Sequence, residues 1–239
     1  MKKYHVAILG ATGAVGMQML EVLLERDFPL ASLHLLASKR SAGKVITMKG
    51  QSFTVAEATE NSFEGIDIVL GATENDIAKR FIPHAVRAGA VVIDNSSAYR
   101  LDDSVPLIIP EVNPEAVQKH KGIIANPNCA TIIALVALQP LHAKAKIKRM
   151  VVSTYQAVSG AGVNGLKELD DQIDALRNNE PVTIKTFRHQ IAYNLIPQIG
   201  GFDEAGYSSE EMKMQNEGRK ILNLPELQVN CTCVRVPVY

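Results

Sequence analysis

The stretch YHVAILGATGAVGMQMLEVLL, residues 4–24, decides the fold of the first half of the chain. Its first six residues are typical of a buried strand, and the residues from Met17 onward have helical spacing. Between them, Gly10, Gly13 and Gly16 form a G-x-x-G-x-x-G turn, whose missing side chains let a pyrophosphate approach the backbone at the helix N-terminus. A glycine turn that only packs helix against strand is the alternative. The flanking strand and helix favour a dinucleotide site.

Strand and helix patterns go on alternating after this turn. Strands are expected at residues 33–37, 66–70 and 91–93, and an amphipathic helix at 76–88. Polar residues 94–97 follow the last of these strands, at the edge where open α/β sheets bind ligands. The alternation predicts an α/β fold with a doubly wound parallel sheet of Rossmann type.

Ser38-Lys39-Arg40-Ser41 follows the second expected strand, where a dinucleotide enzyme contacts the adenosine ribose. An NAD site usually offers an acid to the 2′-hydroxyl, whereas cationic and hydroxyl side chains suit a 2′-phosphate. The sequence therefore predicts NADP, with an ordinary exposed basic loop as the alternative. The small residues Gly71, Ala72 and Thr73 would again bring backbone close to the cofactor.

A lone thiol follows the turn Asn126-Pro127-Asn128. Cys129 precedes an apolar run, residues 132–138, that is long enough for a buried helix, with Asn128 as the expected N-cap. The first turn of a helix carries unpaired N–H groups at the positive end of the macrodipole, which favour a thiolate and could hold an oxyanion. Cys129 is thus a candidate nucleophile, and a small buried hydrophobe is the alternative.

The pattern changes after the cysteine helix. A strand at 150–155 leads into residues 156–162, a helix is expected at 165–176, and a final strand at 227–238. Ser208 and Glu211 have capping-box spacing at the start of another helix. We infer an NADP-binding domain over residues 1–128 and an α+β catalytic and dimerisation domain over 129–239 that is truncated at its C-terminus.

Composition excludes several classes of protein. Forty-six per cent of the residues are hydrophobic, and 25 basic residues balance 25 acidic ones, so no overall charge attracts nucleic acid or an anionic membrane. Neither a signal peptide nor a membrane span is expected, which predicts a cytoplasmic protein. Three cysteines indicate no disulfide framework, and the Cys231-Thr232-Cys233 pair in a strand favours core packing over a metal site.

Taken together, these motifs resemble the aspartate-β-semialdehyde dehydrogenase family over essentially the whole chain. The similar segments are the glycine turn at 10–16, Asn126-Pro127-Asn128-Cys129, Gln156 through Gly162, and Glu210-Glu211-Met212-Lys213. The resemblance implies NADPH-dependent reduction of L-4-aspartyl phosphate to aspartate semialdehyde, on the route to lysine, threonine and methionine. It also implies a homodimer or homotetramer.

The resemblance assigns roles to individual residues. It implies that Cys129 forms a thioester and that Gln156 orients the acyl-enzyme. The implied substrate contacts are phosphate to Arg100, Asn128 and Lys213, the α-carboxylate to Arg235 and the α-ammonium to Glu210. The implied cofactor contacts are Gly10, Thr12, Gly13, Ala14, Val15, Ser38, Arg40, Ser41, Thr73, Ser159 and Gly160, and no metal is implied.

One family feature has no counterpart in this sequence. The general acid/base histidine of the family is expected a few residues beyond Tyr239, and none of the six histidines falls in its place. We therefore expect a fragment of a longer enzyme that is weak or inactive as written. Two alternatives stay open: an enzyme like N-acetyl-γ-glutamyl-phosphate reductase, against which the charge of Glu210 argues, and an inactive NADP-binding fragment.

Overall fold

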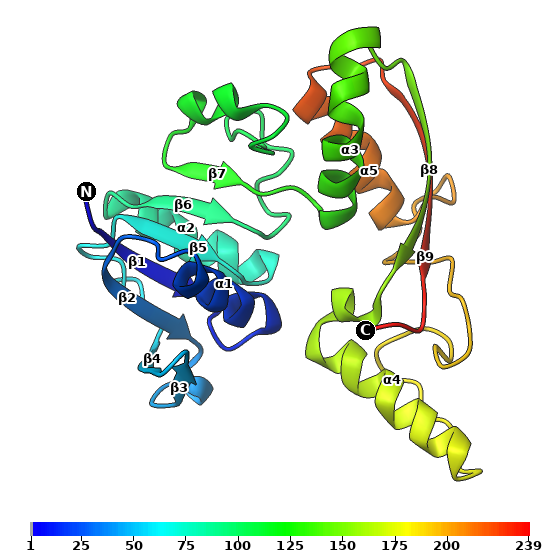
Figure 1. The fold of residues 1–239 in the computed structure, drawn as a ribbon, viewed down its shortest axis with the longest axis horizontal. Coiled ribbons are helices and arrows are strands. Elements are labelled where there is room, and N and C mark those ends of the chain that lie inside the picture. Colours follow the sequence, from blue (N-terminus) through cyan, green and yellow to red (C-terminus); the bar gives the residue numbers. More distant parts are fainter. Residues whose placement is uncertain (1) are drawn as a thin grey trace. The chain divides into compact units, whose positions relative to one another are not determined.

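The computed structural model describes residues 2–239, which divide into two compact units, one ending at Pro127 and one running from Asn128 to Tyr239 (Figure 1). The first unit is built on a seven-stranded sheet with the order β3-β4-β2-β1-β5-β6-β7. All neighbouring strands are parallel except β3 and β4, which form an antiparallel hairpin at one edge. The strands are β1 (Tyr4–Leu9), β2 (Leu30–Ala37), β3 (Val45–Met48), β4 (Gln51–Glu57), β5 (Ile68–Gly71), β6 (Val91–Asp94) and β7 (Ile123–Ala125).

Apolar side chains cover both faces of this sheet. Ile8 packs with Leu20 of helix α1 (Ala14–Glu25), whereas Ala7 and Leu9 pack on the opposite face with Ile82 of helix α2 (Asn75–Arg87). Burial on both faces explains why β1 is a continuous apolar run rather than an alternating one. Short 3-10 helices, η1 (Lys39–Ser41) and η2 (Pro114–Lys119), complete the unit. The predicted α/β fold with a doubly wound parallel sheet is confirmed.

The second unit contains a two-stranded parallel sheet, three α-helices and one short 3-10 helix (Figure 1). Strands β8 and β9 pair along their full length, from Arg149 opposite Gln228 to Gln156 opposite Arg235. This register places Gln156 and Arg235 side by side at the carboxyl ends of both strands. The elements are α3 (Cys129–Ala145), β8 (Arg149–Gln156), η3 (Val158–Ala161), α4 (Gly162–Arg177), α5 (Ser209–Leu222) and β9 (Gln228–Arg235).

Helix α4 organises the long loop that follows it. The buried Glu168 carboxylate accepts hydrogen bonds from the backbone N–H groups of Lys185 and Thr186, and Gln172 Oε1 accepts from those of Ile191 and Ala192. Burial by itself raises the pKa of Glu168, but these hydrogen bonds outweigh it and lower the pKa. An ionised carboxylate therefore supports a loop that would otherwise leave buried amides unpaired.

Helix α5 begins at the predicted capping box. Ser208 Oγ accepts a hydrogen bond from the Glu211 N–H, and Glu211 Oε2 accepts one from the Ser208 N–H at 2.7 Å. The other Glu211 carboxylate oxygen accepts from the backbone N–H of Cys233, which ties the start of α5 to β9. Among the helices within residues 2–239, none combines the length and apolarity that a membrane crossing requires.

Candidate active site

Cys129 is the first residue of α3 and its side chain is exposed. Asn128 is the N-cap, as predicted: its Oδ1 accepts hydrogen bonds from the N–H groups of Ala130, at 2.9 Å, and Thr131, at 3.3 Å. The exposure excludes the alternative in which Cys129 is a buried hydrophobe. The cap also uses two of the first-turn amides that were expected to hold an oxyanion, so these two N–H groups are committed to Asn128.

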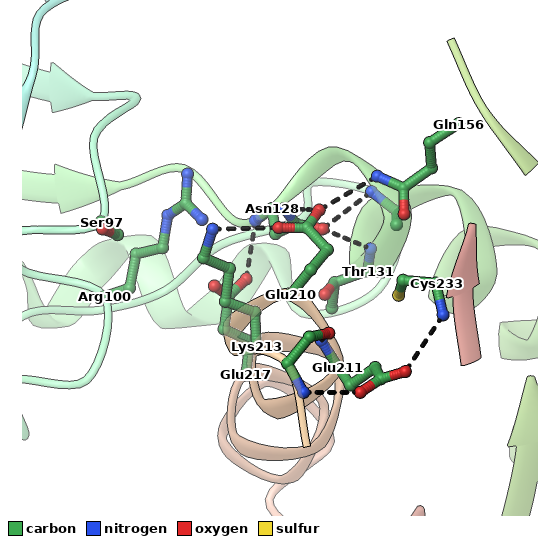
Figure 2. A network of polar contacts seen from close by, with 12 residues as sticks. Ser97, Arg100, Asn128, Thr131, Gln156, Glu210, Glu211, Lys213, Glu217 and Cys233 are labelled. Atoms are coloured by element: carbon green, nitrogen blue, oxygen red, sulfur yellow. Dashed lines mark hydrogen bonds and ion pairs between the residues drawn. The ribbon is translucent and has the colours of Figure 1, made fainter. Parts of the chain in front are cut away.

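The Glu210 carboxylate joins three side chains of this site (Figure 2). Its Oε1 accepts hydrogen bonds from Asn128 Nδ2 at 2.8 Å and from Gln156 Nε2 at 3.1 Å. Its Oε2 accepts from Lys213 Nζ at 3.0 Å, one turn further along α5. Thr154 donates to Gln156 Oε1 at 2.8 Å, which leaves the Gln156 amino group directed at Glu210.

These partners also decide the charge of Glu210. Burial by itself raises the pKa of this carboxyl, but the Lys213 ammonium and the hydrogen bonds from Lys213, Asn128 and Gln156 outweigh burial and lower the pKa. Glu210 is therefore an anion at neutral pH, in a site where only 7% of the residue's surface is exposed.

Arg235 brings a cation to the same site from the end of β9. Its Nη1 donates to the Ala157 carbonyl oxygen at 2.6 Å, and burial lowers its pKa while Glu210 and Cys129 act in the opposite sense. A Cβ on Gly160 would lie 2.7 Å from Arg235 Nη1, so any larger residue at position 160 would push the guanidinium from its observed position. Arg235 is thus held beside the 156–160 segment.

A cavity of about 250 Å³ collects these groups within the second unit. It brings together seven of the residues expected to form the site and adds three that the sequence did not single out, all from α5 or the segment before it. The seven are Asn128, Cys129, Gln156, Gly160, Glu210, Lys213 and Arg235, and the three are Ile199, Gly200 and Ser209. Ser159 lies outside this lining, in η3.

Arg100 belongs to the first unit. It is buried, and its Nη2 donates to the Asn95 carbonyl oxygen at 2.8 Å. Its role toward a phosphate stays a prediction.

A second cavity, of about 440 Å³, lies in the first unit at the glycine turn and the carboxyl ends of β1, β2 and β5. Five of the residues predicted to contact a cofactor line this cavity: Gly10, Thr12, Gly13, Ser38 and Thr73. The lining also includes Lys39, Glu57 and Arg80, which were not among the expected contacts. Ala14, Val15, Arg40 and Ser41 lie outside it, the first two at the start of α1 and the last two in η1.

The glycine turn beside this cavity is closely packed. Gly10 has φ +90, and a Cβ there would lie 2.4 Å from the Ala72 carbonyl oxygen, so the turn closes only with glycine. Gly16 packs as closely, because a Cβ added at this position would lie 2.3 Å from the Gly10 carbonyl oxygen. Thr73 Oγ1 is buried without a hydrogen-bond partner among residues 2–239, which leaves it available to a polar ligand in the cavity.

The two units match two described protein domains. Residues 5–120 match the NAD-binding domain of semialdehyde dehydrogenases, and residues 138–239 match the semialdehyde dehydrogenase dimerisation domain. The chain is 50% identical to aspartate-semialdehyde dehydrogenase of Bacillus subtilis over 241 residues, which cover 98% of this chain and 70% of that protein. The chain belongs to the aspartate-semialdehyde dehydrogenase family.

Solved structures of this family have the same fold. Aspartate semialdehyde dehydrogenase II of Vibrio cholerae, complexed with ASA, superposes with a TM-score of 0.98 at 48% identity, over 100% of this chain and 72% of that one. The aspartate semialdehyde dehydrogenase of Candida albicans, solved with NADP, superposes with a TM-score of 0.73 at 27% identity, over 99% of this chain and 68% of that one.

Sequence reasoning missed one residue that touches the cysteine turn. Glu217 of α5 is 2% exposed, and its Oε2 accepts a hydrogen bond from the backbone N–H of Asn128 at 2.6 Å. Its spacing of seven residues from Glu210 puts both carboxylates on one face of α5, about two turns apart. That spacing was the only available signal, and it did not reveal a partner 89 residues earlier in the chain.

Proposed function

We propose that this chain is the part of an aspartate-semialdehyde dehydrogenase that converts L-4-aspartyl phosphate to L-aspartate-4-semialdehyde through a thioester on Cys129. One observation carries the proposal: the exposed thiol at the start of α3 shares a cavity with a buried anion, Glu210, and two cations, Lys213 and Arg235. An amino acid whose side chain ends in an acyl phosphate offers charges complementary to all three groups.

In the first step, the Cys129 thiolate attacks the acyl carbon of the substrate. A carbon–sulfur bond forms, the bond from the acyl carbon to the phosphate oxygen breaks, and phosphate leaves with the electron pair. Gln156 Nε2 carries a second N–H beside the one given to Glu210, and it is our candidate donor to the developing oxyanion.

The charged groups would orient the substrate. Arg235 would hold the α-carboxylate with two parallel N–H donors, and Glu210 would accept from the α-ammonium. A carboxylate has about four lone-pair positions, and three of those on Glu210 are used by Asn128, Gln156 and Lys213, so one is left for the ammonium. Lys213, Asn128 and Arg100 would bind the phosphate.

The cofactor proposed for this chain is NADPH, which supplies the hydride that reduces the thioester. Gly10, Thr12, Gly13, Ser38 and Thr73 would hold it in the first unit, and Ser159 with Gly160 would contact its nicotinamide end. Hydride addition to the thioester would leave an alkoxide, whose collapse breaks the carbon–sulfur bond, returns the electron pair to Cys129 and releases the aldehyde. The general acid/base that the family resemblance places beyond Tyr239 would give a proton to this alkoxide and take it back as the carbon–sulfur bond breaks.

The test measures NADPH formation from aspartate semialdehyde, phosphate and NADP by the intact protein. Cys129→Ser should lower kcat about a thousandfold or more, because the nucleophile is lost. Cys231→Ala, which alters a buried thiol outside the cavity, serves as the control and should keep most of the activity. A Cys129→Ser enzyme with more than a tenth of the wild-type rate would refute the thioester, and equal rates with NAD would refute the cofactor preference.

A further inference from the structure

Asn128 forms hydrogen bonds through its side-chain oxygen, its side-chain amino group and its backbone N–H. Its Oδ1 caps α3, its Nδ2 donates to Glu210, and its backbone N–H donates to Glu217. The last bond is the shortest of these, at 2.6 Å from N to Oε2, and a buried carboxylate accepts it.

Glu217 pairs with an N–H group that lies outside the hydrogen-bond ladder of α3. An N-cap N–H precedes the first hydrogen-bonded turn and needs a side-chain acceptor, which Glu211 provides for Ser208 in α5 and Glu217 provides for Asn128. Glu217 fixes the backbone of Asn128, at φ −61 and ψ 141, while Glu210 fixes the side chain. Since Cys129 is the next residue, these two clamps from α5 determine the direction in which its side chain leaves the helix.

Glu217 itself does not reach the reacting atoms. It is absent from the lining of the Cys129 cavity, whereas Glu210 and Lys213 on the same helix are part of that lining. We propose that Glu217 is a positioning residue, which orients the Cys129 thiol by holding the Asn128 N–H. This inference rests on the proposed function only for the role of Cys129 as nucleophile.

Two substitutions separate hydrogen-bond geometry from charge. Glu217→Gln keeps the length of the side chain and a carbonyl oxygen that can accept, whereas Glu217→Asp keeps the charge but withdraws the acceptor by one methylene. Positioning therefore predicts that the Gln variant performs better than the Asp variant. A role of the charge alone predicts the reverse order.

The first readout is the second-order rate constant for alkylation of Cys129 by iodoacetamide at pH 7, followed by peptide mass spectrometry. Glu217→Asp should lower this constant about tenfold, because misplacement of a reacting group by a fraction of an ångström has effects of this size. Glu217→Gln should stay within about threefold of wild type. The second readout is steady-state turnover. The Glu217→Asp variant should have a lower kcat than wild type and an unchanged KM for NADP.

Glu168→Asp is the matched control. Glu168 is also a buried carboxylate that accepts backbone N–H bonds, but it supports the loop after α4 and does not line the Cys129 cavity. Its shortening should lower the melting temperature and leave the alkylation rate at the wild-type value.

Alkylation of Glu217→Asp at the wild-type rate, or of Glu217→Gln as slowly as Asp, would overturn the inference. If wild-type protein makes no NADPH, the proposed function fails separately, since the alkylation experiment needs no turnover.

Discussion

At the scale of single residues, Glu210 is the most connected side chain of the site. One of its oxygens accepts hydrogen bonds from Asn128 and Gln156, and the other accepts one from Lys213. Glu210 therefore orients all three of these side chains. The family resemblance implied contact of Glu210 with a ligand. The structure shows in addition that Glu210 pairs with Lys213.

The lowered pKa of Glu210 predicts a pH-dependent contribution to stability. A carboxyl whose folded-state pKa lies below its unfolded value stabilises the fold above that unfolded value, about 4.5, and loses the contribution as pH falls through the folded value. Glu210→Gln should therefore lower the free energy of unfolding by about 1–3 kcal/mol at pH 7, with a smaller difference at pH 4.

Urea unfolding followed by circular dichroism at both pH values measures this difference. The exposed Glu204→Gln is the control and should leave the unfolding midpoint unchanged. A gap between wild type and Glu210→Gln that grows in acid would contradict the assignment.

Single-residue roles were predictable to different degrees. Asn128 as a cap follows from local chemistry, because the N–H groups that donate to its side chain are only two and three residues away. Glu217 depends on a contact across 89 residues, and no local rule connects a helical glutamate to one particular amide that far away. The same limit explains why Arg80 in α2 was missed as part of the dinucleotide cavity.

At the scale of elements, strand and helix positions followed the hydrophobic pattern closely. β1 was predicted at its observed bounds, and α2 and α4 within a few residues of theirs. The hairpin β3–β4 was not predicted. Its strands alternate between polar and apolar residues at an exposed edge, and only Val55 of β4 enters the core, so their apolar signal is weak.

The capping box of α5 gives a test at this scale. Ser208→Ala removes the acceptor for the Glu211 N–H in a fully buried position, so the free energy of unfolding should fall by about 1 kcal/mol. Ser38→Ala is the control, because Ser38 precedes η1 without a side-chain cap bond. Thermal unfolding of both variants measures the difference, and equal losses of stability would show that the box contributes nothing.

At the scale of the whole molecule, the second unit carries the match to a dimerisation domain, and it has an exposed apolar strand face. Val151 and Tyr155 of β8 lie on that face and are 70% and 75% exposed. Contiguous exposed apolar surface can mark a site of protein–protein interaction. A homodimer, or a tetramer built from dimers, is our proposal for the assembly.

Val151→Asp should convert the protein to a monomer, because an unpaired carboxylate would be buried at the interface. Light scattering after size exclusion measures the mass. Val45→Asp, on β3 of the first unit, makes the same change at a 62% exposed strand valine and should leave the mass unaltered. An unchanged mass for Val151→Asp would place the interface elsewhere.

The hydrogen bond from the Asn128 N–H to Glu217 has a consequence for the synthesis of the protein on the ribosome. Glu217 is translated 89 residues after Asn128, an interval of roughly 5 to 20 s at ordinary rates of synthesis. During that time the Asn128 N–H, next to Cys129, has no Glu217 carboxylate to pair with. Every strand of the first unit's sheet has already been synthesised. The nascent chain therefore contains all strands of the first unit's sheet before the residue that holds the Asn128 N–H has been synthesised.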